Sequence, residues 1–251
     1  MAEVEVGQYR AKVPEGRSIT TNGGVRSAYF EPQGSELWSA TATMTPGATI
    51  TWEGDHGDEA IYIDRGEVRT DDQIVGPGDV VIIEAGVLAT IEARTDATLV
   101  LFGPKRHEPP THGAFGPPAL EGRGVHVRRA ADLPVLPHPG YWRQLYADST
   151  CPTCRITLFS VTGEEGYSTG SHLHSEDEII HVLEGELQVG RLAVGPNSGL
   201  AVPGNQRYGF RARTSFRFLN YRRDVSTYTG TPGSQPVLET VLQAMRNAGG
   251  T

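Results

Sequence analysis

The sequence has few cysteines, few aromatic residues and no long apolar run. Aromatic residues make up 8% of its 251 residues, and its two cysteines lie close together in "STCPTCRITLF". No stretch approaches the roughly 18 apolar residues of a membrane span. The start, "MAEVEVGQYR", has neither the basic nor the apolar region of a secretory signal. We therefore expect a cytoplasmic protein without a membrane partner.

Basic residues are also in the minority. The chain has 22 lysines and arginines against 30 acidic residues, a formal net charge of -8, and no basic run that could follow a phosphate backbone. We therefore expect no nucleic-acid partner.

The two cysteines, Cys151 and Cys154, form a C-x-x-C motif. Redox motifs of this kind open a helix, whereas the residues that follow here read as a strand. A structural zinc site would need two more ligands nearby. We predict a turn with two reduced thiols and assign it no function.

Glycine and proline, by contrast, are frequent, with 31 and 17 residues. They separate short apolar runs such as "EAIYIDRGEV", "DVVIIEA", "ATLVLF" and "SFRFLNY", a pattern typical of an all-β sandwich or barrel. One helix is expected at the C-terminus, where Leu238, Val241, Leu242 and Met245 recur at helical spacing after Ser234.

The sequence also repeats itself at an offset of 119 residues. Without a gap, this offset aligns Gly47 with Gly166, Glu59 with Glu178, Gly66 with Gly185, and Gly76-Pro77 with Gly195-Pro196. The chain therefore reads as two copies of one β domain. We place them at residues 28–104 and 141–224, with an inter-domain linker at 105–140 and a helix or tail at 225–251. Four histidines lie among the prolines and glycines of the linker, and nothing in their spacing predicts a site.

The second copy contains the stretch "HLHSEDEIIHVLEG". His172 and His174 lie two residues apart, so in a strand they share one face, and Glu178 begins the next strand. Two imidazoles and one carboxylate directed at one point are typical of non-haem Fe(II), and Mn, Ni or Zn tolerate the same arrangement. By strand alternation His181 lies on the opposite face and is expected to pack or form an interface.

This stretch resembles the first signature of the cupin superfamily, in which His-x-His is followed after three residues by Glu and after six more by Gly. The segment "GPNSGLAVPGNQRYGF" resembles the second signature. The resemblance covers both copies. It implies a bicupin, that is, two tandem cupin domains with the double-stranded β-helix or jelly-roll fold. Cupins include dioxygenases, decarboxylases, isomerases, hydrolases and binding proteins, so the resemblance predicts the fold more specifically than the function.

The second signature departs from the family at its histidine, the usual fourth metal ligand. If Pro203 is the proline of the motif, this position is Tyr208, with Gln206 and Arg207 as neighbours. We expect Tyr208 to point inward as a catalytic or metal-contacting phenol.

The first copy lacks the histidines. Glu53, Asp55, Glu59 and Ala89 occupy the matching positions. Three carboxylates could bind Mg or Ca, but they would crowd negative charge, so we favour a degenerate, structural first cupin.

The sequence therefore predicts one divalent transition metal per chain, bound by His172, His174 and Glu178, with iron favoured. We favour slightly a non-haem Fe(II) dioxygenase acting on a small polar metabolite. The alternatives are a non-redox Mn or Zn enzyme of the aminohydrolase, isomerase or decarboxylase type, and a non-catalytic binding or regulatory cupin. Arg155, Arg217 and Asn220 are candidates for substrate binding. A homodimer is left open.

Overall fold

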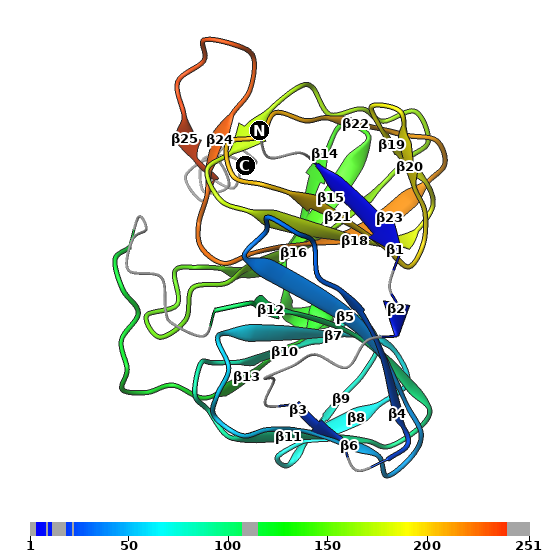
Figure 1. The fold of residues 1–251 in the computed structure, drawn as a ribbon, viewed down its shortest axis with the longest axis vertical. Coiled ribbons are helices and arrows are strands. Elements are labelled where there is room, and N and C mark those ends of the chain that lie inside the picture. Colours follow the sequence, from blue (N-terminus) through cyan, green and yellow to red (C-terminus); the bar gives the residue numbers. More distant parts are fainter. Residues whose placement is uncertain (1–3, 9, 12–18, 22, 107–114, 240–251) are drawn as a thin grey trace.

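The computed structural model describes residues 4–8, 10–11, 19–21, 23–106 and 115–239, and their regular secondary structure is almost entirely β-strand. Figure 1 shows two groups of antiparallel sheets, one above the other. The predicted all-β class is confirmed. Within the described residues, no helix is long and apolar enough to cross a membrane.

The N-terminal sheets comprise a large and a small sheet. The large sheet has, in order, β13 (Val125–Arg128), β10 (Val80–Ile83), β7 (Glu59–Arg65), β12 (Ala97–Pro104), β5 (Leu37–Met44), β4 (Val25–Phe30) and β2 (Arg10–Ala11). The small sheet has β3 (Ile19–Thr21), β6 (Thr49–Trp52), β11 (Ala89–Ala93), β8 (Val68–Thr70) and β9 (Gln73–Val75). A buried apolar cluster that includes Trp52, Ile61 and Leu99 is made of residues from both sheets.

The C-terminal sheets also begin with a large sheet. Its order is β1 (Glu5–Gln8), β21 (Ser198–Val202), β18 (Glu178–Glu184), β23 (Phe216–Arg222), β16 (Thr157–Gly163), β15 (Tyr141–Asp148) and β14 (Val135–His138). Two smaller sheets are β20 (Leu192–Val194), β19 (Leu187–Val189) and β22 (Phe210–Ala212), and β17 (Leu173–His174), β24 (Thr227–Thr229) and β25 (Val237–Leu238).

The sequence repeat recurs in the strands. β18 starts and ends 119 residues after β7, and the same offset relates β19 to β8 and β20 to β9. Gly66 and Gly185 occupy equivalent turns with φ of +75° and +77°, and a Cβ atom there would lie 2.2 and 2.1 Å from a backbone oxygen. Only glycine fits both requirements, which explains why it recurs at this position.

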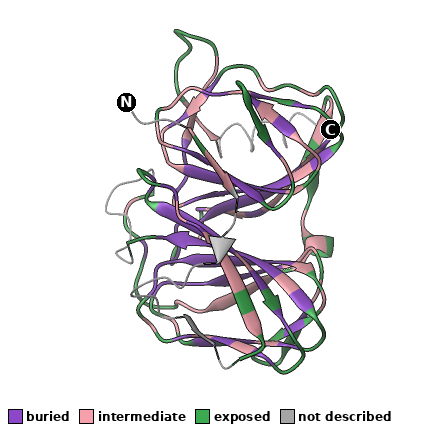
Figure 2. Ribbon diagram, turned by 45° about the vertical axis from the view of Figure 1, so that its right-hand side comes forward, coloured by how far each residue is buried: buried purple, intermediate pink, exposed green. Residues whose placement is uncertain are grey.

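The two large sheets pack face to face. Their shared cluster includes Tyr62 and Phe102 from the N-terminal sheets and Ile179 and Tyr221 from the C-terminal sheets, and the rings of Phe102 and Tyr221 stack at 5.4 Å. Figure 2 shows buried residues along the strands between the two groups. Because the other face of each large sheet covers its own core, these strands are apolar on both faces.

The side chains of β18 alternate between the core of the C-terminal sheets and the interface of the two large sheets. Ile180 and Val182 face the core of the C-terminal sheets, whereas Ile179 faces the other large sheet. The buried His181 ring meets Phe102 edge-on at 6.4 Å. The predicted packing role of His181 is confirmed.

Two expectations for the segments outside the repeat need correction. The predicted linker, 105–140, contains strands, since β13 extends the N-terminal large sheet and β14 extends the C-terminal one. The predicted C-terminal helix cannot start near Ser234, because Val237 and Leu238 form β25 and pair with β24. The remainder of that predicted helix, residues 240–251, lies outside the described residues.

Candidate active site

Backbone pairing brings His172, His174 and Tyr208 together. His174 lies in β17, and His172 forms a β-bridge with Tyr208 through N···O contacts of 3.0 and 2.9 Å. The ring centroids of the two histidines are 5.1 Å apart, and those of His172 and Tyr208 are 4.5 Å apart. All three side chains are buried. Tyr208 thus points inward beside the histidines, as the repeat offset predicts.

Both imidazoles direct Nδ1 at a backbone carbonyl. Nδ1 of His172 lies 2.8 Å from the oxygen of Gly170, and Nδ1 of His174 lies 3.3 Å from that of Thr227. Because a carbonyl only accepts, the proton belongs on Nδ1, which leaves the lone pair on Nε2. Burial also lowers the pKa of His172, which favours its neutral form.

Glu178 starts β18 and is fully buried. Its Oε2 accepts hydrogen bonds from Asn220 Nδ2 at 2.7 Å and from Nε and Nη2 of Arg222 at 3.2 and 2.9 Å. Burial raises the pKa of this carboxyl, but Arg222 and His174, together with the Tyr208 hydroxyl and the Asn220 amide, outweigh burial, and the pKa falls to about 2. The Tyr208 hydroxyl approaches the carboxylate, yet Oε1 has no partner in hydrogen-bond geometry within the described part of the chain.

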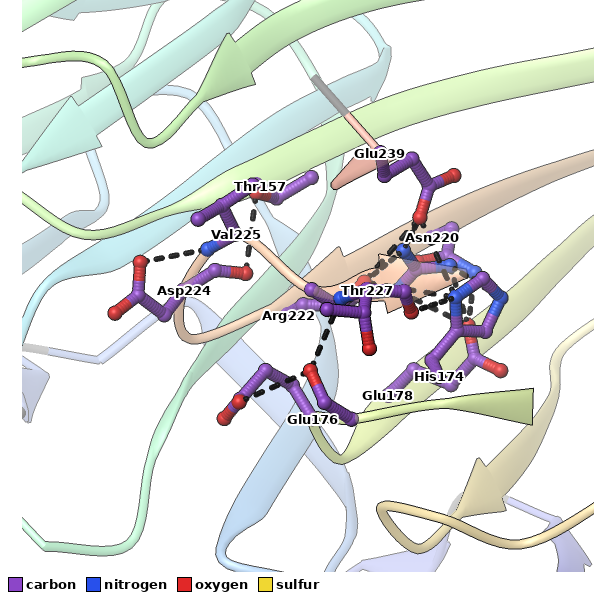
Figure 3. A network of polar contacts seen from close by, with 12 residues as sticks. Thr157, His174, Glu176, Glu178, Asn220, Arg222, Asp224, Val225, Thr227 and Glu239 are labelled. Atoms are coloured by element: carbon purple, nitrogen blue, oxygen red, sulfur yellow. Dashed lines mark hydrogen bonds and ion pairs between the residues drawn. The ribbon is translucent and has the colours of Figure 1, made fainter. Parts of the chain in front are cut away.

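Arg222 lies at the centre of this polar network (Figure 3). Its Nη2 contacts both Glu178 and Nε2 of His174, the latter at 3.0 Å, while Nη1 donates to Ser226 Oγ at 2.7 Å and to Glu239. Burial lowers the pKa of the guanidinium, but the negative charges of Glu239 and Glu178 together raise the pKa by more than burial lowers it. The pKa therefore lies above its ordinary value, and Arg222 stays charged. The network therefore holds one buried cation between two carboxylates.

Glu239 closes the network from the C-terminal segment. Its carboxylate contacts Arg222, Nη1 of Arg143 at 3.2 Å and Nδ1 of His174 at 3.3 Å. Burial raises the pKa of Glu239, but Arg222, His174 and Arg143 together outweigh burial and hold the pKa well below its usual range. Sequence reasoning missed both residues. Strand alternation from Asn220 could have indicated Arg222, whereas no sequence signal joined Glu239 to the site.

A cavity of about 170 Å³ adjoins the network. Its polar lining includes His172, His174, Tyr208, Asn220, Arg222, Glu239 and Arg143, and its apolar lining includes Phe159, Val161, Ile180, Phe210 and Phe218. Nε of Arg143 and Oδ1 of Asn220 are buried without a hydrogen-bond partner in the described residues. A small ligand with both donor and acceptor oxygens suits such a lining.

Tyr208 contributes a phenol that stays protonated. Burial raises its pKa well above the usual range, and the neighbouring negative charge of Glu178 raises it further. The hydroxyl can therefore donate a hydrogen bond or a proton at neutral pH.

Two of the three predicted substrate contacts lie elsewhere. Arg155 is buried, but its guanidinium donates to carbonyl groups of residues 116 and 154, far from this cavity in the fold. Arg217 contacts Glu184 at 2.7 Å and the Tyr62 hydroxyl at 3.2 Å, between the two large sheets. Neither side chain lines the cavity. For Arg217, strand alternation alone does not say which face of a doubly covered sheet borders the cavity. Asn220 does line it.

The carboxylates of the first copy do not gather around one point. Among the described residues, only one group of three His, Cys, Asp or Glu side chains has its ligand atoms within 4.8 Å of one another, and Glu53, Asp55 and Glu59 do not belong to it. Glu59 instead accepts a hydrogen bond from Trp52 Nε1 at 2.8 Å. His56 directs both ring nitrogens at backbone oxygens.

The candidate metal site of the second copy suits a metal ion in its donor types but not in the spacing of its ligand atoms. The donor types fit, because Nδ1 of each histidine faces a carbonyl and Glu178 is an ionised carboxylate, although Nε2 of His174 already accepts a hydrogen bond from Arg222. The spacing does not fit as it stands, because the ligand atoms of His172, His174 and Glu178 do not all lie within 4.8 Å of one another. Nη2 of Arg222 occupies the position where one ion would contact His174 and Glu178. A metal therefore requires the guanidinium to move away from these two residues.

No protein-family model and no curated protein matches the chain. Solved structures do. Oxalate decarboxylase from Bacillus subtilis, determined at pH 4.6, is 16% identical, with a TM-score of 0.67 over 96% of this chain and 82% of its own. A structure from a study of the Mn(II) centres of Bacillus subtilis oxalate decarboxylase is also 16% identical, with a TM-score of 0.66 over 96% of this chain and 83% of its own. The likeness shows that the chain has a cupin-like all-β fold.

Proposed function

We propose that this chain is a metal-dependent bicupin enzyme that acts on a small carboxylic acid. Residues 28–104 and 141–224 are the two cupin domains, and the reaction takes place in the second. The observation that carries the proposal is the buried, charged Arg222, which borders a cavity of about 170 Å³ together with His172 and His174. A guanidinium is the side chain best suited to bind a carboxylate through paired hydrogen bonds.

His172, His174 and Glu178 would hold a divalent metal, which when bound supplies Lewis acidity for polarising a substrate oxygen. We propose manganese in preference to the iron expected from the sequence. The likeness to an oxalate decarboxylase with Mn(II) centres favours it.

The residues that line the cavity bind and orient the substrate, donate a proton and exclude water. Arg222 releases His174 and Glu178 and takes a substrate carboxylate, while Glu239 keeps hold of its Nη1 and so limits how far it moves. Arg143, whose Nε has no partner among the described residues, orients the far end of the substrate. Tyr208 holds a proton on its hydroxyl and donates it to the product carbon or oxygen. The aromatic wall excludes water.

A second candidate is a metal-free binding protein, favoured by the contact of Arg222 with both His174 and Glu178. In this alternative the guanidinium is the permanent cation of the site, and the cavity binds a small anion without chemistry.

The test uses protein loaded with Mn(II) and a panel of short mono- and dicarboxylic acids that includes oxalate, with products followed by NMR and carbon dioxide release. We expect turnover of at least one acid, lost in His174→Ala and in Arg222→Leu. Arg217→Leu, which removes an arginine of the same strand outside the cavity, is the control and should retain activity. If no acid is turned over, but one binds metal-free protein and fails to bind Arg222→Leu, the second candidate is correct and the enzyme proposal is wrong.

A further inference from the structure

The C-x-x-C motif, to which the sequence assigned no function, gains partners in the fold. Cys151 and Cys154 lie between β15 and β16, and Glu84 follows β10 of the N-terminal large sheet. These three form the one group of potential metal ligands whose atoms lie within 4.8 Å of one another in the described part of the chain. Both cysteines are free thiols. The cluster therefore lies where the C-terminal sheets meet the N-terminal ones.

Glu84 is the centre of this cluster. Its Oε1 lies 3.4 Å from Cys151 Sγ, 3.0 Å from His126 Nε2 and 2.6 Å from Thr153 Oγ1, while Oε2 accepts from the Gly124 amide at 2.7 Å. His126 lies in β13, directly opposite Ile82 of β10. With Zn–S near 2.3 Å and Zn–O or Zn–N near 2.0 Å, tetrahedral ligands lie roughly 3.3 to 3.7 Å apart. The contacts of Glu84 with Cys151 and His126 are close to that separation.

The hydrogen bonds around the cluster also suit a cation. Glu84 accepts from the Thr153 hydroxyl and from the Gly124 amide, and these bonds hold its carboxylate beside the sulfurs. Thiolates, not thiols, are metal ligands, so binding of a metal at this cluster would release the thiol protons.

The loop is held in a form that presents both sulfurs. The Arg155 guanidinium donates to the carbonyl oxygens of Cys151 and of Cys154, the latter at 2.9 Å. Its amide donates to Asp58 Oδ2 at 3.0 Å, and Asp58 Oδ1 also accepts from the Ala85 amide at 2.8 Å. Asp58 thus ties the residue after Cys154 to the residue after Glu84. This explains the burial of Arg155 away from the cavity.

We propose that Cys151, Cys154, Glu84 and His126 form a structural site for a zinc-like divalent metal. His126 lies 3.0 Å from Glu84 but outside the group of three, so its ring completes the set by moving toward the sulfurs. Two sulfur ligands, one nitrogen and one oxygen then give a closed tetrahedral set that leaves no position for substrate. His126 comes from β13 at the edge of the N-terminal large sheet, Glu84 directly follows the neighbouring β10, and the cysteines come from a loop of the C-terminal sheets. The metal would therefore fasten the two groups of sheets together. The site is separate from the His172 and His174 region and does not depend on the proposed function.

The test is titration of the full-length, reduced, metal-free protein with Co(II). The chain has only two cysteines, so any thiolate-to-cobalt charge-transfer band must arise from Cys151 and Cys154. We expect such a band at one equivalent, its loss on adding Zn(II), and an unchanged band in His172→Ala. Absence of the band in wild-type protein would overturn the proposal, and this arm requires no variant to fold.

Variants test the two remaining ligands. Glu84→Gln and His126→Ala should each weaken Zn(II) binding by at least about tenfold, because four ligands become three. A chelator should lower the melting temperature of wild-type protein but not that of the double variant Cys151→Ser with Cys154→Ser. Equal zinc affinity in all variants, or isolation of the chain with a Cys151–Cys154 disulfide that reducing agent does not open to bind Co(II), would contradict the assignment.

Discussion

Replacing Arg222 with methionine tests how far this buried cation determines the stability of the site. The change removes the partner of two buried carboxylates, Glu178 and Glu239. Loss of one partner of a buried ion pair typically costs about 3 to 5 kcal/mol. For Glu178 alone, the difference between its usual pKa of 4.5 and about 2 corresponds to about 3 kcal/mol, which agrees with that range.

The assay is urea denaturation of metal-free wild-type and Arg222→Met protein from pH 7 downward. The folded-state pKa of Glu178 is depressed, so its contribution is complete above the unfolded pKa and is lost as pH falls toward about 2. The variant lacks this contribution. The difference between the two proteins should therefore be largest at neutral pH and should narrow below pH 4.5, where carboxylates begin to be protonated.

The matched control is Arg217→Met. Arg217 pairs with Glu184, but its side chain is 32% exposed and that of Glu184 is 66% exposed. An exposed pair of this kind is worth about 0 to 1 kcal/mol. If Arg222→Met were no more destabilising than the control, or if the difference between Arg222→Met and wild-type protein did not change with pH, Arg222 would not be the cation that balances the two carboxylates.

Three further predictions follow from individual side chains. Tyr208→Phe should retain the fold and the bound metal but lower turnover roughly 100-fold or more, because the variant lacks the proton on the phenol; unchanged turnover in a steady-state assay would exclude that role. His181 is buried and its pKa is lowered to about 3 by burial, so the unfolded chain binds a proton below pH 6.5 that the folded chain does not. Stability should therefore fall by up to about 1.4 kcal/mol per pH unit between these values, and His181→Leu should flatten the profile in denaturation experiments. Glu59→Ala should cost about 1 to 3 kcal/mol, because Trp52 Nε1 loses its buried acceptor, and elemental analysis should show no change in metal content.

Much of the arrangement was predictable because it depends on short-range periodicity. The two-residue spacing of His172 and His174 and the alternation along β18 depend only on strand geometry, which also places His181 against Phe102. The offset of 119 residues placed Tyr208 at the cavity, since both copies fold with equivalent strands. The structure brings His172, His174 and Tyr208 together.

The residues that sequence reasoning missed approach from distant segments. Glu239 reaches Arg222 from the residue directly after β25, and Cys151 meets Glu84 across 67 positions. Arg217 lies in β23, which is covered on both faces, so strand alternation does not identify the face that borders the cavity, and Arg155 precedes β16 in a loop. Pairings of this kind depend on tertiary packing, which leaves no local pattern in the sequence.

Binding of Mn(II) to metal-free protein, followed by electron paramagnetic resonance, tests the central claim most directly. Manganese prefers oxygen and nitrogen ligands to thiolates, so this ion reports on the His172, His174 and Glu178 site and not on the cysteine cluster. The account predicts one bound Mn(II) per chain, lost in His174→Ala and in Glu178→Gln, and retained in the double variant Cys151→Ser with Cys154→Ser. No bound Mn(II) in wild-type protein, or equal binding by the wild-type, His174→Ala and Glu178→Gln proteins, would contradict it.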